Sequence, residues 1–102
     1  MYAQVIRGLV REDAWEELRE LTEAWCSEHA ERAQGFKELH FLREVNSDDG
    51  VVFVLFWESQ RLANQTGSSP ATEAYFKRLM DLVSAEPVFL GAESISRCLA
   101  PS

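Results

Sequence analysis

The sequence VVFVLFW, from Val51 to Trp57, contains no polar side chain and is built from valine, leucine and aromatic residues. Such residues are enriched in β-strands, so this stretch is predicted to be a strand. Successive side chains of a strand alternate between two faces, and here both rows are apolar. One row comprises Val51, Phe53, Leu55 and Trp57, and the other Val52, Val54 and Phe56. We therefore expect both faces to be covered, one by helices and the other by a second subunit.

Length and charge limit what the rest of the chain can be. The 102 residues suit a single domain, residues 1–102, and no segment approaches the roughly 20 apolar residues of a membrane span. The net charge of −7 has the wrong sign for neutralising phosphates, so we expect neither nucleic acid nor a membrane surface as a partner. The N-terminal residues lack the pattern of a secretory signal. Because Cys26 and Cys98 lack metal-ligand spacing, we interpret them as reduced thiols of a cytoplasmic protein.

Ahead of Val51 the sequence predicts a strand, a helix and a second strand. The first strand runs from Tyr2 to Val10, with Ala3, Val5, Arg7 and Leu9 on one face. Asp13 and Glu16 have the spacing of a capping box and would start a helix that Gly35 ends. Its buried stripe is Ala14, Leu18, Leu21 and Trp25.

A hairpin is predicted around the turn-forming residues 46–50, which join a second strand, Phe36 to Val45, to the apolar strand. If this loop is symmetric about Asp48, one face carries Leu39, Phe41, Phe53, Leu55 and Trp57. Glu38 and His40 would then share the opposite face with Val54 and Phe56. A slip of one residue would reverse the assignment.

Two helices and a strand are predicted to follow. Gln60 to Thr66 can form a short helix closed by Gly67, and Ser69 with Pro70 can start another, as N-cap and first helical residue. Glu86 and Pro87 would stop this helix, which buries Tyr75, Phe76, Leu79, Met80 and Val83. A last strand is expected from Val88 to Leu99, with Pro101 and Ser102 as a loose end.

This order predicts an α+β fold of the ferredoxin-like βαββαβ type, a four-stranded antiparallel sheet with its helices on one face. The other face would be bare and would carry Ile6, Val52, Val54 and Phe56. An exposed apolar patch usually marks an interface. We therefore expect a homodimer through the sheet face, in which two sheets close a barrel around a two-fold axis.

Several side chains are candidates for a site. Arg7 lies in an apolar row, so it either pairs with a carboxylate or faces a cavity that takes an anionic ligand. Tyr75 could donate its hydroxyl into the same pocket or belong to the core, and Trp25 could pack or touch a ligand. Trp57 is either a core residue or part of the site, and a buried indole N–H needs a partner in both cases.

The run FVLFWESQ, Phe53 to Gln60, precedes a short helix, a Ser69-Pro70 break and a second helix, and Gly35-Phe36 leads into the second strand. This arrangement resembles the antibiotic biosynthesis monooxygenase family of dimeric α/β barrels. The resemblance implies a pocket between sheet and helices with Trp57 on its wall. Characterised members of that family oxidise polycyclic phenols or quinols without metal or flavin, and others degrade haem.

The resemblance implies a cofactor-independent monooxygenase that acts on an aromatic, polyketide or quinol-type small molecule. Its catalytic candidates here are Trp57, Arg7 and Tyr75, and its pocket candidates are Phe53, Leu55, Trp25, Phe41 and Val5. Haem is not expected, because the residues of the haem-degrading members are replaced by Val5, Thr66 and Phe76. No other cofactor or metal is expected. Phe53 stands where the polyketide-oxidising members carry a polar residue, which favours the alternative, a non-catalytic dimeric module that binds a hydrophobic small molecule.

Overall fold

The computed structural model describes residues 1–101 and contains four strands, three α-helices and one short 3-10 helix, Ala30–Arg32. In chain order the main elements are β1 (Tyr2–Leu9), α1 (Trp15–His29), β2 (Phe36–Arg43), β3 (Gly50–Trp57), α2 (Gln60–Gly67), α3 (Pro70–Leu82) and β4 (Val88–Glu93). The strands form one sheet in the order β2-β3-β1-β4, and every neighbouring pair is antiparallel. The predicted ferredoxin-like fold is confirmed.

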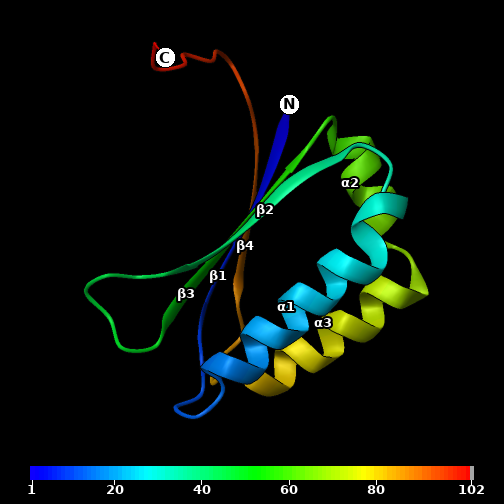
Figure 1. Ribbon diagram of the computed structural model, residues 1–102. Coiled ribbons are helices and arrows are strands. Elements are labelled where there is room, and N and C mark those ends of the chain that lie inside the picture. Colours follow the sequence, from blue (N-terminus) through cyan, green and yellow to red (C-terminus); the bar gives the residue numbers. More distant parts are fainter. Residues whose placement is uncertain (102) are drawn as a thin grey trace.

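All the α-helices lie on one face of the sheet (Figure 1). Helices α1 and α3 run side by side, and α2 lies near the end of β3 that carries Trp57. Within residues 1–101, no helix or strand covers the opposite face, which we call the outer face. Nor does any helix in that range have the length and apolarity needed to cross a bilayer.

The apolar stretch is confirmed as the centre of the core. Val51, Phe53 and Trp57 point toward the helices and are buried, and Trp57 is only 2% exposed. The predicted stripe of α1 is buried as well: Ala14, Leu18, Leu21 and Trp25. One buried cluster surrounds Leu18 and Phe53, and a second surrounds Trp57, Trp25 and Ala63.

The side chains of the hairpin lie on the faces predicted for them, but their cross-strand pairs differ from the predicted ones. Leu39 pairs with Leu55 and Phe41 with Phe53, so the register is centred on Ser47 rather than on Asp48. The difference shifts each pairing by two residues, and a shift by two leaves every side chain on its face.

Several predicted boundaries are wrong. Asp13 and Glu16 do not form a capping box: a turn in which the Ala14 N–H donates to the Arg11 carbonyl places Ala14 at the N-cap, with no side-chain cap. Glu16 bonds Arg19 instead. Helix α1 ends at His29, and the 3-10 helix separates it from Gly35.

The C-terminal boundaries differ too. Helix α3 ends at Leu82, because the next residue, Val83, leaves helical geometry and forms a β-bridge with Val10. Strand β4 stops at Glu93 because its partner strand begins at Tyr2, the residue that pairs with Glu93. Of the predicted loose end, Pro101 is exposed and outside any element, and Ser102 lies outside the described residues.

The predicted faces of β1 are reversed. Arg7 pairs with Val52 and Val5 with Val54, so both belong to the outer face, whereas Ile6 pairs with Phe53 and faces the helices. The Arg7 side chain is 68% exposed and forms an ion pair with Glu44, with Nε 2.6 Å from Oε1. The placement of Arg7 in the pocket and of Ile6 on the bare face is therefore wrong. The ion pair, which was the other interpretation of Arg7, is what the structure contains.

Candidate functional site

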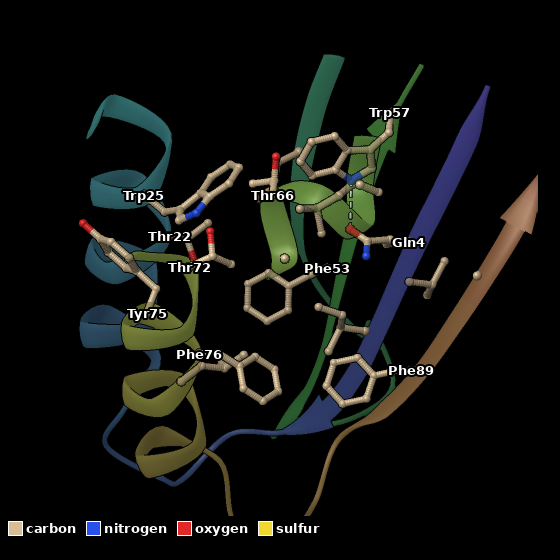
Figure 2. Close-up of a pocket in the computed structure, with 18 of the residues that line it drawn as sticks. Gln4, Thr22, Trp25, Phe53, Trp57, Thr66, Thr72, Tyr75, Phe76 and Phe89 are labelled. Carbon is tan, nitrogen blue, oxygen red and sulfur yellow. Dashed lines mark hydrogen bonds between the residues drawn. The ribbon is translucent and has the colours of Figure 1, made fainter. Parts of the chain in front are cut away.

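A cavity of about 490 Å³ lies between the inner face of the sheet and the helices. That volume falls within the range of pockets that bind small organic ligands. Figure 2 shows its lining, which is mostly aromatic and aliphatic. The lining includes Gln4, Ile6, Phe53, Leu55 and Trp57 from the sheet, Leu21, Thr22 and Trp25 from α1, Ala63 and Thr66 from α2, Thr72, Tyr75 and Phe76 from α3, and Phe89 from β4. The lining thus draws on the sheet and on all three α-helices.

Two residues of the lining, Trp57 and Gln4, are joined by a hydrogen bond between their side chains. The Trp57 indole N–H donates a hydrogen bond of 2.8 Å to Oε1 of Gln4 (Figure 2). Trp57 is almost completely buried, and a buried indole N–H needs an acceptor, which Gln4 supplies. The bond therefore fixes both the indole plane and the amide group beside it.

Gln4 was not among the residues predicted for the site, because the reversed faces of β1 placed it on the wrong side of the sheet. A signal was present in the sequence. Gln4 is a polar residue between Tyr2 and Ile6 in one alternating row, and the buried Trp57 needed an acceptor from a neighbouring strand.

Tyr75 borders the cavity with its ring, but its hydroxyl is directed elsewhere. The hydroxyl donates to the carboxylate of Glu28 on α1 and points away from Phe53 and Trp57 (Figure 2). This hydrogen bond, with smaller contributions from burial and from the negative charge of Glu28, raises the pKa of Tyr75. The His29 ring packs edge-on against Tyr75 at 5.3 Å between centroids. The Tyr75 hydroxyl is therefore held outside the cavity.

The other predicted site residues are distributed as follows. Phe53, Leu55 and Trp25 border the cavity together with Trp57. Val5 also borders it, although its row on β1 is the outer one. Phe41 is not part of the lining: its ring stacks on Phe53 at 5.2 Å and lies 6.0 Å from Trp15. Arg7, on the outer face, does not meet Trp57 and Tyr75.

The remaining polar groups of the cavity are mostly uncharged. The Thr22 hydroxyl is occupied by a 2.9 Å bond to the Leu18 carbonyl, and Thr66 of α2 also borders the cavity (Figure 2). The lining formed by residues 1–101 includes the carboxylate of Glu73, which is exposed, and no Lys, Arg or His. In the same range no three His, Cys, Asp or Glu side chains are grouped as metal ligands would be. The cavity therefore suits a ligand that enters in its uncharged form, since a charged one would lose hydration without gaining a counter-ion.

One border of the cavity is formed by two exposed aromatic side chains. Phe76 of α3 and Phe89 of β4 face each other with 5.4 Å between ring centroids (Figure 2). The contact between them joins the helix layer to the edge strand β4. A ligand in the cavity would thus meet aromatic rings on both the sheet side and the helix side.

No family model matches the sequence, and no curated protein is significantly similar to it. Solved structures do match. A variant of SnoaB, described as a cofactor-independent oxygenase from Streptomyces nogalater, has a TM-score of 0.81 at 17% identity, over 94% of this chain and 94% of that one. The chain has the fold of the antibiotic biosynthesis monooxygenases. A protein from Deinococcus radiodurans that carries this name has a TM-score of 0.83 at 11% identity, over 100% of both chains.

A third structure, from Nitrosomonas europaea and also named as an antibiotic biosynthesis monooxygenase, has a TM-score of 0.79 at 14% identity. It covers 94% of this chain and 100% of that one. The likeness thus extends over nearly all elements, including every element that lines the cavity. At these identities the likeness is one of fold.

Proposed function

We propose that the chain is a cofactor-independent monooxygenase that oxidises an aromatic, polyketide or quinol-type small molecule in the cavity beside Trp57. The observation that carries this proposal is the cavity itself, about 490 Å³ in volume, lined by aromatic side chains and containing the Gln4–Trp57 hydrogen bond. Supporting it is the fold shared with SnoaB, a protein described as a cofactor-independent oxygenase.

In such a reaction the substrate supplies the electrons. An ionised phenol or anthrone reduces oxygen, and a ring CH₂ with O₂ becomes a ketone and water, so the protein's task is to position the ring and exclude bulk water. Trp57, Trp25 and Phe53 would hold the ring, and Gln4 would offer the amide group. The described lining offers only one carboxylate, that of Glu73, and it is exposed. The best substrates would therefore be those acidic enough to lose their proton without a buried general base.

A specific observation favours the second candidate, a non-catalytic dimeric module that binds a hydrophobic small molecule. The Trp57 N–H is already bonded to Gln4, and the Tyr75 hydroxyl is bonded to Glu28. Neither group is free to polarise a substrate. Phe53, near the middle of the cavity, adds an apolar surface and no hydrogen bond.

The proposal includes a homodimer formed through the outer face. This face carries Val54 and Phe56 of β3 and, around them, Leu42, Val88 and Leu90, which are 45%, 67% and 61% exposed. Exposed apolar side chains gathered on one face usually mark an interface, and a second copy presents a matching surface by two-fold symmetry. We also propose a cytoplasmic location, because Cys26 and Cys98 are free thiols.

Oxygen uptake with a panel of anthrones and hydroquinones tests the enzyme. At least one compound should be consumed, and Trp57→Phe should lower kcat/KM about tenfold, equivalent to ~1.4 kcal/mol. The matched control is Trp15→Phe, since Trp15 lies outside the lining and donates to the Asp48 carbonyl at 3.3 Å. If several compounds bind and none accelerates oxygen consumption, the enzyme is rejected in favour of the binding module.

A further inference from the structure

We infer that the side-chain amide of Gln4 is the group that selects the ligand, by donating a hydrogen bond from Nε2 to a carbonyl or phenolic oxygen on a flat aromatic molecule. The inference rests on the proposed function for the choice of cavity, but not on any turnover. Gln4 would thus bind ligand in addition to its structural hydrogen bond with Trp57, and the ligand would be an oxygen-bearing aromatic molecule.

The orientation of the amide follows from chemistry. An indole N–H can only donate, so the atom of Gln4 that lies 2.8 Å from Trp57 Nε1 must be the oxygen. The amide is planar, and its NH₂ group must therefore point away from Trp57. Figure 2 shows the Gln4 nitrogen on the side remote from the indole.

The NH₂ group has donors to offer. Within residues 1–101, no protein oxygen accepts a hydrogen bond from Gln4 Nε2, while Gln4 borders the cavity. The neighbours of Gln4 across the sheet are Leu55 and Gly91, and neither has a polar side chain. An acceptor for these N–H groups must therefore come from water or from a ligand.

The residues around Gln4 determine which class of ligand would bind most tightly. Trp25, Phe53 and Leu55 line the same cavity and favour a flat apolar molecule. An oxygen on that molecule would replace water at Gln4, whereas a pure hydrocarbon would leave the amide donors without an acceptor. The cavity should therefore discriminate between an aromatic ketone and a hydrocarbon of the same shape.

The probes are 9-fluorenone and fluorene, which are both planar tricyclic molecules and differ by a carbonyl in place of a CH₂ group. Neither depends on oxygen chemistry. Binding is followed by quenching of tryptophan fluorescence, because Trp25 and Trp57 border the cavity. The wild type should bind fluorenone about fivefold to tenfold more tightly than fluorene, the effect of one net hydrogen bond.

Two variants test the residue. Gln4→Met keeps the length of the side chain and Gln4→Leu shortens it, and both remove the donor, so in each the ratio of the two affinities should fall to about one. Fluorene measures the integrity of the cavity and should still bind both variants. Gln65→Met makes the same chemical change at an exposed position of α2 outside the lining and should keep the wild-type ratio.

The inference is overturned if the wild type binds the two probes equally, if it binds neither, or if the preference for the ketone survives in both Gln4 variants. Its failure is distinguishable from that of the proposed function. A protein that prefers the ketone but consumes no oxygen loses the oxygenase activity and keeps this inference. One that oxidises an anthrone without preferring fluorenone to fluorene shows the reverse.

Discussion

The side chains of Trp57 and Gln4 are hydrogen-bonded diagonally across two neighbouring strands, with 2.8 Å between Nε1 and Oε1. Trp57 pairs with Tyr2, and Gln4 pairs with Leu55. The bond therefore connects two successive cross-strand pairs on the inner face of the sheet. It links the largest fully buried side chain of the core to the wall of the cavity. Stability and ligand binding therefore depend on the same contact.

Replacing Gln4 by Leu should lower the free energy of unfolding by about 1–3 kcal/mol, because the buried Trp57 N–H is left without an acceptor. Urea denaturation monitored by circular dichroism measures the change. Gln65→Leu, at an exposed position of α2, should stay within about 0.5 kcal/mol of the wild type. Equal stability of the two variants would mean that the bond contributes nothing to folding.

Gly35→Ala should destabilise the protein by more than about 1 kcal/mol. Gly35 has a φ of +82°, and a Cβ at this position would lie 2.5 Å from Leu62 Cδ1, so dihedral strain and a clash act together. The control is Gly67→Ala: Gly67 is the last residue of α2, and a Cβ at this position would have nothing within 4 Å, so its replacement should be neutral or slightly stabilising. Thermal denaturation compares the variants, and a Gly35→Ala protein as stable as Gly67→Ala would contradict the prediction.

The titration of Tyr75 should depend on Glu28. The hydrogen bond to Glu28 raises the pKa of Tyr75 above its ordinary value of 10.0, so Glu28→Gln should move the titration to lower pH. The difference in tyrosinate absorbance between the wild type and Tyr75→Phe isolates this group from Tyr2. A titration that stays in place in Glu28→Gln would contradict the bond.

The same bond makes stability depend on pH. A group whose pKa is higher in the folded than in the unfolded state stabilises the fold below the unfolded pKa, here about 10. This contribution is lost as the pH rises through the folded pKa of Tyr75. Wild type should therefore lose more stability than Tyr75→Phe in that alkaline range, and parallel pH profiles of the two proteins would refute this.

Val54→Arg should convert the proposed dimer to a monomer. Val54 lies on the outer face between Val5 and His40, so an arginine there would bury an unpaired charge in the interface. The dimer dissociation constant should rise at least about a hundredfold. Sedimentation velocity at micromolar concentration measures the state, with Glu20→Arg on the exposed side of α1 as the control. A monomeric wild type would reject the dimer outright.

Local pattern was sufficient for most elements. The unbroken apolar run identified β3, the spacing of Leu18, Leu21 and Trp25 identified the buried side of α1, and Ser69-Pro70 marked the start of α3. Each of these signals is carried by neighbouring residues and survives without knowledge of the rest of the chain. The order of the elements then favoured one sheet topology.

The predicted ends of helices and strands were wrong where pairing with a distant part of the chain determined them. The end of β4 depends on where β1 begins to pair, and the end of α3 depends on the bridge between Val10 and Val83. The start of α1 depends on a turn at Arg11 that competes with capping by Asp13. These alternatives differ by small local energies, so the sequence pattern alone did not separate them.

The sequence by itself determined that β3 is apolar on both rows, that the elements follow the ferredoxin-like order, and that Trp57 needs an acceptor. Only the tertiary structure decided which side chains of β1 share the cavity with it. Alternation divides β1 into two rows of similar polarity, and the covered row is set by pairing with a strand more than forty residues away, where Gln4 meets Leu55 and Arg7 meets Val52. This pairing places Gln4 on the cavity side of the sheet and Arg7 on the outer face. Because it is non-local, the sequence of β1 alone could not predict it.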